Sequence, residues 1–345
     1  MSKRPRLPCI PESPKIASLS GVPRPSSFAC LQHATEDKSA IPYVRSTTSV
    51  TPEHAPGNLA CLPHPHRRFP DWLKKPLFFR NRYVSVVSCL AKNRLHTVCA
   101  EAKCPNRDEC FSAGTATFLI MGTICTRHCG FCGVQHGKPF PLDSEEPAQV
   151  ANAAKTLNLR HIVITSVTRD DLPDHGADHF AETVRQCRNC SPEATIELLI
   201  PDFRGNQDAL DTVLAASPDI LSHNIETVPR LYPAVRPQAD YQRSLDLLAY
   251  AYNKKIVTKS GFMVGLGETE KEVVDVLKSL YGAGCRIVTI GQYLQPSNSQ
   301  VTVQHYFPPE QFERYEKTGR LMGFKHVFAG PFVRSSYRAH EAFHR

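Results

Sequence analysis

Short apolar segments alternate with amphipathic segments through most of the chain. The apolar segments are rich in β-branched residues and predict six strands, at 117–121, 161–167, 195–200, 220–225, 256–264 and 286–293. Between the strands, apolar residues recur at helical spacing and predict helices at 147–157, 177–187, 209–215, 241–252 and 269–281. A further helix is predicted at 309–322, after the last strand. Glu268 and Glu270 flank the start of the helix at 269–281, where negative charge favours the helix dipole.

This alternation predicts an α/β fold in which parallel strands are joined by right-handed helical crossovers. Six such units fit a partial (β/α)6 barrel of the TIM type, with its chemistry at the carboxyl ends of the strands. The alternative is a doubly wound open sheet, which needs a glycine-rich phosphate turn after its first strand. A cysteine-rich loop follows Met121 instead, and this favours the barrel.

The segments outside the barrel divide the chain into four predicted regions. Residues 1–66 are rich in Pro, Ser and Thr and lack helical or strand periodicity, so we expect a disordered or loosely attached extension. Residues 67–114 form an N-terminal cap that includes a helix-like stretch at 83–93. The barrel takes residues 115–306, and residues 307–345 hold the last helix and a C-terminal segment.

Composition and charge exclude several classes of protein. With 41% hydrophobic and 21% charged residues, the chain is typical of a globular enzyme. Its longest apolar runs, 194–201 and 256–266, are far shorter than the ~18 residues of a membrane span, so we expect no membrane association. The net charge of +8 suits an acidic partner. We expect no nucleic-acid partner, because basic and aromatic residues are not interleaved as in RNA-binding proteins.

Cysteine usage indicates a reducing compartment. Six of the thirteen cysteines crowd between Cys99 and Cys132 at uneven spacings, which favours metal binding over disulfides. No hydrophobic signal-peptide core lies near Met1, so cytoplasmic residence is the expectation. Alternatively, the first 66 residues include a transit peptide to the mitochondrial matrix or a plastid, since only Glu12 is acidic up to Thr35. Their many prolines disfavour the amphipathic helix of such a peptide.

Three cysteines follow the first predicted barrel strand, in the loop Cys125-Thr-Arg-His-Cys129-Gly-Phe-Cys132. A 4Fe–4S cluster held by three thiolates leaves one iron open to a small molecule. The C-x3-C-x2-C spacing is the signature of the radical SAM superfamily, in which S-adenosylmethionine (SAM) binds that iron and is cleaved to a 5′-deoxyadenosyl radical. The alternative is a zinc site, but zinc ribbons use paired knuckles and need a fourth ligand such as His128 or His136.

A second triplet lies upstream, with Cys99, Cys104 and Cys110 spaced as C-x4-C-x5-C. Unpaired reactive thiols are a liability in a reduced chain, so two unrelated triplets within 34 residues are an improbable coincidence. The second triplet therefore implies a second cluster.

From about Trp72 to Ala339 the chain resembles the lipoyl synthase family. The resemblance rests on both cysteine triplets and on five further motifs: Ile164-Thr-Ser-Val167, Arg169-Asp-Asp-Leu172, Pro201-Asp-Phe-Arg-Gly205, Gly265-Leu-Gly-Glu-Thr269 and Gln292-Tyr-Leu-Gln-Pro-Ser297. It departs from the family at one turn, where His175 stands in place of the expected glycine.

The resemblance implies a ligand for the second cluster from the far end of the chain. In the family, the upstream triplet binds an auxiliary 4Fe–4S cluster together with a serine of a C-terminal Arg-Ser-Ser-Tyr motif. The motif is present here at residues 334–337, which assigns the role of fourth ligand to Ser336. An alkoxide is a harder ligand than a thiolate, so its iron could be released when a cluster sulfide attacks carbon.

Polar residues near the predicted strand ends are candidates for binding SAM. Asn224 and Glu226 would point the same way at the end of the fourth strand. Thr165 and Ser166 end the second strand and are candidates for the same reason. Lys259, on the fifth strand, is a further candidate. Alternatively, Asn224 and Glu226 have a structural role only, and their side chains form the caps and turns that end the strand.

Together these features imply a radical SAM sulfurtransferase. The resemblance implies that Cys125, Cys129 and Cys132 hold the catalytic cluster, while the auxiliary cluster donates two sulfur atoms to C6 and C8 of a protein-bound octanoyl chain. It implies an octanoylated lipoyl carrier domain or H protein as substrate, and a one-electron reductant such as ferredoxin or flavodoxin. The rival interpretations are another sulfur-inserting radical SAM enzyme of the biotin synthase type, which lacks the upstream triplet, and a zinc-stabilised binding module without catalysis.

Overall fold

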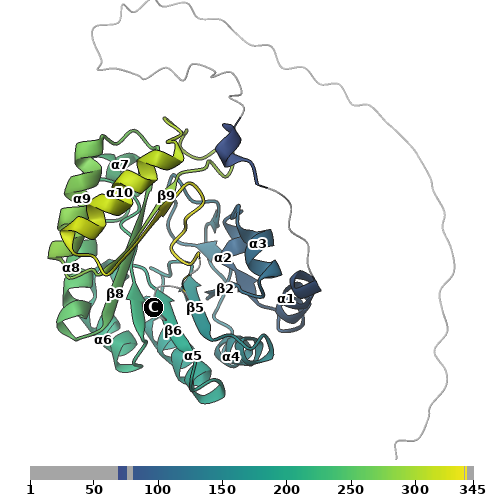
Figure 1. The fold of residues 1–345 in the computed structure, drawn as a ribbon. Coiled ribbons are helices and arrows are strands. Elements are labelled where there is room, and N and C mark those ends of the chain that lie inside the picture. The colour runs from purple at the N-terminus through teal and green to yellow at the C-terminus, as the bar shows by residue number, and fades with distance from the viewer. Residues whose placement is uncertain (1–68, 76–80, 338, 340–345) are drawn as a thin grey trace, which may run out of the picture. The chain divides into compact units, whose positions relative to one another are not determined.

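The computed structural model describes residues 69–75, 81–337 and 339, and the predicted extension at 1–66 lies outside them. Eight strands of the described residues form one sheet in the order β1-β2-β5-β6-β7-β8-β9-β10 (Figure 1). Their bounds are His96–Thr97, Thr117–Ile120, His161–Ser166, Thr195–Leu199, Ile220–Ser222, Val257–Val264, Ile287–Gln292 and His326–Gly330. All pairings from β2 to β10 are parallel, whereas β1 pairs antiparallel with β2.

The six predicted strands correspond to β2 and β5 to β9, and the structure confirms the predicted α/β fold. The count of six was wrong, because β1 and β10 extend the sheet at its two edges. The strand β1 has only two residues, too few to show the alternation of a strand, and β10 lies in the predicted C-terminal segment, for which no strand was expected. The fourth strand ends at Ser222 rather than at 225, although Glu226 still bridges to Phe262 of β8.

Helices follow one another along the outer side of the curved sheet (Figure 1). They are α4 (Glu146–Thr156), α5 (Ala177–Cys190), α6 (Gln207–Ala215), α8 (Tyr241–Asn253), α9 (Glu270–Gly282) and α10 (Pro309–Met322). Each lies within a few residues of its prediction. Their starts have local causes: Asn206 and Asp240 cap α6 and α8, and Thr269 with Glu272 forms a capping box on α9.

Among the described residues, three α-helices precede the barrel: α1 (Asn81–Lys92), α2 (Val98–Glu101) and α3 (Arg107–Ser112). The largest apolar cluster joins them to the barrel, since Val86, Phe111 and Phe118 pack in the same buried group as the inner faces of α4 and α5. A second cluster lies between β8, β9 and helices α9 and α10. The sheet is therefore a fixed frame for the loops at its carboxyl edge.

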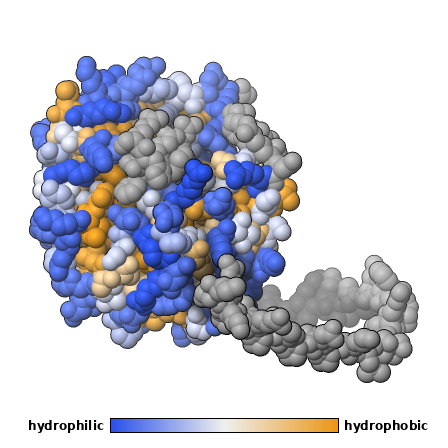
Figure 2. All heavy atoms as spheres, turned by 60° about the horizontal axis from the view of Figure 1, so that its bottom comes forward, coloured by the Kyte–Doolittle hydropathy of each residue, from blue (hydrophilic) through white to orange (hydrophobic). Residues whose placement is uncertain are grey.

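Hydrophobic and hydrophilic residues are mixed on the face shown in Figure 2. In the view of Figure 2, hydrophobic residues form small areas separated by hydrophilic ones. Among the described residues, each helix is too short or too polar to cross a bilayer.

Candidate active site

The first cysteine triplet lies in a loop that begins directly after β2. Two short strands, β3 (Ile124–Cys125) and β4 (Gln135–His136), pair across the base of this loop. Burial raises the pKa of Cys132 to about 12, and the neighbouring Cys129 and Cys125 add to the effect. Burial likewise raises the pKa of Cys129, with Cys125 contributing. The three thiols therefore lie near one another, and each of the three residues is partly exposed.

Backbone groups shape the loop around these sulfur atoms. The amides of Arg127 and Thr168 donate to Sγ of Cys125 at 3.4 and 3.3 Å, a contact that tunes metal-bound thiolates. Gly130 packs against the segment after β7, and a Cβ there would lie 2.7 Å from the carbonyl oxygen of Ala234. A larger residue at position 130 would thus displace the loop.

Arg127 fastens the loop to two barrel strands. Its guanidinium donates to both carboxylate oxygens of Asp170, at 2.7 and 3.0 Å, and to Oδ1 of Asp202 at 2.6 Å. The three side chains are at most 6% exposed. Burial alone would raise the pKa of Asp202, but the hydrogen bonds and charge of Arg127 hold that pKa well below its usual range. Because Asp170 follows β5 and Asp202 follows β6, the loop position is tied to the sheet.

Asn224 and Glu226 lie in the segment after β7 rather than on the strand itself, and Arg236 lies beside them. Arg236 donates to the carbonyl oxygen of Asn224 at 2.8 Å and is 8% exposed. Burial raises the pKa of Glu226, and the charge of Arg236 opposes that rise. Arg236 comes after a short helix, α7 (Tyr232–Val235), and nothing in the local sequence pattern distinguishes it from a surface arginine.

Several buried polar atoms near these strand ends have no hydrogen-bond partner in the protein. They include Oγ of Ser166, Oγ of Ser222, Oδ1 of Asn224 and Nε of Arg236. An unpaired buried donor or acceptor is costly, so native structures satisfy such atoms with a ligand or with water. The arrangement offers donors and acceptors for a polar cofactor such as SAM.

The polar groups of two other predicted cofactor contacts, Thr165 and Lys259, already form hydrogen bonds with other residues of the protein. Thr165 donates its hydroxyl to the carbonyl oxygen of Leu199 at 2.9 Å. Lys259 is buried, and its Nζ contacts the two carboxylate oxygens of Glu197 at 2.8 and 3.1 Å. The argument that placed Lys259 at a strand end was wrong, because β8 continues for five residues to Val264.

The upstream triplet also comes together in space. Cys99 lies in α2, Cys104 follows that helix, and Cys110 lies in α3. Burial raises the pKa of Cys99 to about 11, and Cys104 adds to this rise. Burial raises the pKa of Cys110 to about 12, with Cys99 and Cys104 contributing, while the charge of Lys75 acts in the opposite direction.

The C-terminal segment returns to this triplet. Asn106, which lies between Cys104 and Cys110 in sequence, donates to the carbonyl oxygen of Phe332 at 2.6 Å. The segment crosses the end of β9 so closely that a Cβ on Gly291 would lie 2.2 Å from the carbonyl oxygen of Val333. Ser336 is thus carried on a segment that lies against the cap.

Arg334, from the same motif, donates through Nη1 to the carbonyl oxygen of Val333 at 2.7 Å. Burial lowers the pKa of Arg334, and the charges of Cys104 and Glu226 oppose this shift. Cys104 belongs to the upstream triplet and Glu226 to the predicted cofactor contacts. The charge of Arg334 therefore acts on a residue of the upstream triplet and on a predicted cofactor contact.

The donor sets fit iron–sulfur clusters. The described cysteines are free thiols. Within the described ranges, no three His, Cys, Asp or Glu side chains converge tightly enough to hold a single metal ion. In a cubane cluster each thiolate binds its own iron, so its ligands are spaced more widely than those of one zinc ion. Two groups of three neighbouring thiols suit that spacing.

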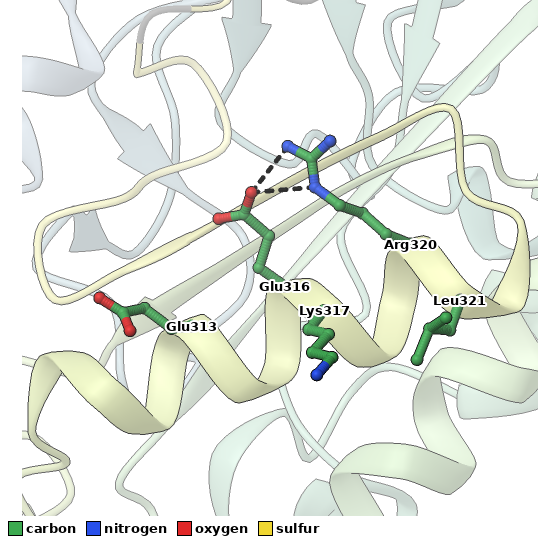
Figure 3. Close-up of a pocket in the computed structure, with 5 residues that line it drawn as sticks. All are labelled: Glu313, Glu316, Lys317, Arg320 and Leu321. Atoms are coloured by element: carbon green, nitrogen blue, oxygen red, sulfur yellow. Dashed lines mark hydrogen bonds and ion pairs between the residues drawn. The ribbon is translucent and has the colours of Figure 1, made fainter.

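A surface hollow on α10 lies apart from these residues. Glu313, Glu316, Lys317, Arg320 and Leu321 line it, and all five come from that helix (Figure 3). Arg320 pairs with Glu316 at 2.7 Å, an exposed contact of a kind that contributes little to stability. None of these side chains belongs to the predicted site.

Comparisons with known proteins agree with this chemistry. Residues 119–280 match the family model described as "Radical SAM superfamily". The lipoyl synthase of Caldanaerobacter subterraneus subsp. tengcongensis is 55% identical over 276 residues, which cover 79% of this chain and 96% of that protein. The lipoyl synthase of Chlorobaculum tepidum is 52% identical, covering 79% and 95%. SuiB of Streptococcus suis, a solved structure, is 10% identical with a TM-score of 0.48, covering 72% and 52%. The chain belongs to the lipoyl synthase family of radical SAM enzymes.

Proposed function

We propose that this protein is a lipoyl synthase that inserts two sulfur atoms at C6 and C8 of a protein-bound octanoyl chain, using SAM and two 4Fe–4S clusters. The observation that carries the proposal is the pair of three-cysteine groups, one in the loop after β2 and one in α2, α3 and the turn between them, with the C-terminal segment hydrogen-bonded beside the second group. An unactivated methylene has no acidic proton for a general base to remove, so the reaction needs homolytic hydrogen abstraction.

Cys125, Cys129 and Cys132 would hold the catalytic cluster. When bound, the clusters and SAM supply a 5′-deoxyadenosyl radical and the sulfur atoms that enter the product. Arg127 keeps the loop in place through Asp170 and Asp202. The remaining work of the chain is to bind and orient SAM, and its unpaired polar atoms at the strand ends suit that task.

Asn224, Glu226 and Arg236 are the strongest candidates for contacts to SAM. The carboxylate of Glu226 suits an ammonium or ribose hydroxyl, and the guanidinium of Arg236 suits a carboxylate. Ser166 also presents an unpaired hydroxyl. Thr165 and Lys259 are weaker candidates because their polar groups already have partners within the barrel.

Cys99, Cys104, Cys110 and Ser336 would hold the auxiliary cluster that is consumed as the sulfur donor. The contacts between the cap and the C-terminal segment support this assignment, since they bring the segment with Ser336 to the triplet. In this scheme residues 67–114 are the cap, residues 115–306 the catalytic barrel, and residues 307–345 the closing segment.

The substrate carrier would be an octanoylated lipoyl domain or H protein, and the electron donor a ferredoxin or flavodoxin. Such partners are commonly acidic, and the net charge of +8 would attract them. We place the reaction in the cytoplasm. The organelle alternative depends on residues 1–66, which lie outside the described residues.

Anaerobic loading followed by a product assay tests the proposal. Protein with two clusters should contain about eight irons, whereas the biotin synthase type of site would give about four in its cubane and a binding module would contain zinc. Incubation with an octanoylated lipoyl-domain peptide, SAM and a reductant should yield 5′-deoxyadenosine and a peptide that carries two added sulfur atoms. A preparation with both clusters that forms no 5′-deoxyadenosine would refute the proposed function.

A further inference from the structure

Lys75 contacts two segments that are remote from it in sequence. Its Nζ donates to Oδ1 of Asn106 and to Oε2 of Glu109, both at 2.6 Å. The same ammonium lies 4.6 Å from the ring centre of Phe332 and 5.5 Å from that of Tyr337. Only 21% of the Lys75 side chain is exposed. One cation thus joins the chain before α1, the start of α3 and the C-terminal segment.

Two hydrogen bonds connect the same residues directly. Asn106, 1% exposed, donates to the carbonyl oxygen of Phe332 at 2.6 Å, and the hydroxyl of Tyr337 donates to Oε1 of Glu109 at 2.7 Å. We call these five residues, Lys75 included, the cap latch. Phe332 and Tyr337 lie on either side of Ser336 in sequence, so the latch fixes the segment at two points around that serine.

We propose that Lys75 is a positioning residue for the auxiliary site, which holds Ser336 against the cap through the cap latch. This inference rests on the proposed function, because it takes Ser336 and the upstream triplet as ligands of one cluster. The local backbone bonds of the segment, from Tyr337 to Arg334 at 3.0 Å and from Ala339 to Ser336 at 3.4 Å, shape its turn without joining it to the cap.

The latch has a consequence for a cluster that is consumed in each reaction. A serine hydroxyl is a poor iron ligand compared with a thiolate, so its contribution depends on being held in place. The cap latch consists of protein groups alone. The segment can therefore stay close to Cys104 and Cys110 after the cluster is spent, ready for a new one to be built.

Lys74 provides a matched control beside Lys75. Its side chain is 68% exposed, and its ion pair is with Asp71, three residues away. Lys74→Met and Lys75→Met remove the same charge from adjacent positions, but only the second change removes a residue of the cap latch. Lys75→Arg keeps the positive charge and the hydrogen-bond donors, so it should retain the auxiliary iron better than Lys75→Met does.

The experiment uses full-length protein loaded anaerobically with both clusters. Iron loss to a bipyridine chelator is followed with time, and Mössbauer spectra assign the lost iron to one site or the other. We expect Lys75→Met to lose auxiliary iron roughly tenfold faster than wild type, the effect of removing a hydrogen-bonded charge, while the catalytic cluster is unaffected. Hydrogen exchange of residues 331–337 should rise in parallel. Lys74→Met should match wild type.

Equal iron loss and exchange in the Lys75→Met and Lys74→Met proteins would overturn the inference. If Lys75→Met does not load, Tyr337→Phe removes one hydroxyl from the latch and should give a smaller acceleration, a few-fold. Absence of any acceleration in that variant would also overturn it. A wild-type protein that holds a single cluster refutes the proposed function itself, whereas a two-cluster wild type with unchanged variants refutes only the latch.

Discussion

The two cysteine sites of this protein are built in opposite ways. Cys125, Cys129 and Cys132 lie within eight residues of one loop, at the end of a barrel strand. The upstream site takes its three cysteines from two short helices and the turn between them, and in our proposal its fourth ligand from residue 336. The first site is encoded locally, whereas the second exists only after distant segments have met.

Their anchors differ in the same way. Arg127 ties the catalytic loop to aspartates that follow β5 and β6, so the loop inherits the rigidity of the buried sheet. The cap latch joins three segments outside the barrel, and the side chains of its Lys75–Glu109 ion pair are 21% and 26% exposed. The loop of the first triplet is thus anchored to the sheet, whereas the upstream triplet and the C-terminal segment are held together by contacts among the segments themselves.

The largest expected effect separates the two sites by their products. Cys125→Ala should lower 5′-deoxyadenosine formation by roughly a thousandfold or more, a barrier increase of about 4 kcal/mol, because the catalytic cluster loses a ligand. Cys104→Ala should still form 5′-deoxyadenosine but give no sulfur-containing product. Chromatography of the nucleoside and mass spectrometry of the octanoylated peptide measure the two outputs. If Cys104→Ala blocks both outputs as Cys125→Ala does, the division of roles is wrong.

The sequence predicted the local features well and the long-range ones poorly. The catalytic triplet and the strands β2 and β5 to β9 follow from spacing and periodicity that a single segment carries. Lys75 and Arg236 could not be recognised this way, because their partners are not close to them in sequence. Lys75 contacts Asn106, 31 residues further on, and Arg236 contacts Asn224, 12 residues before it. The Ser336 assignment came from family resemblance rather than from any local pattern.

Lys259 illustrates an error that sequence reasoning invites. A cation in a strand suggested a cofactor contact, but the ladder places Lys259 opposite Ser222 and Ile287, well before the carboxyl end of β8. There it pairs with Glu197, which also lies 3.1 Å from Nε2 of His161. The length of β8 and its pairing with β7 and β9 decide how far Lys259 lies from the carboxyl end of the strand. The hydrophobic pattern of a single segment does not reveal that pairing.

A second prediction concerns the anchor of the catalytic loop. Arg127→Met leaves Asp170 and Asp202 buried without their main cation, and breaking a buried pair in this way costs about 3–5 kcal/mol. We expect a lower urea midpoint and weaker retention of the catalytic cluster, with auxiliary iron less affected. Anaerobic urea titration and Mössbauer spectra measure these changes. An unchanged midpoint would show that the loop does not depend on this anchor.

The smallest expected effect is a pH dependence of the free energy of unfolding, caused by His223 in the barrel. His223 is 1% exposed, and burial, reinforced by the charge of Arg236, lowers its pKa from 6.5 to about 4. Its Nδ1 lies 2.8 Å from the carbonyl oxygen of Ile200 and its Nε2 lies 3.0 Å from the hydroxyl of Ser244. The neutral ring is therefore the form that the folded protein accommodates.

The sign of this dependence follows from the depressed pKa. Above pH 6.5 the ring is neutral in both states, so it imposes no penalty on folding. As the pH falls from 6.5 towards 4, the unfolded chain takes up the proton first, and the folded state loses up to about 3 kcal/mol of stability relative to it. Urea midpoints of wild type should fall across this window, and His223→Gln should flatten the slope. Equal slopes in wild type and His223→Gln would exclude His223 as the source.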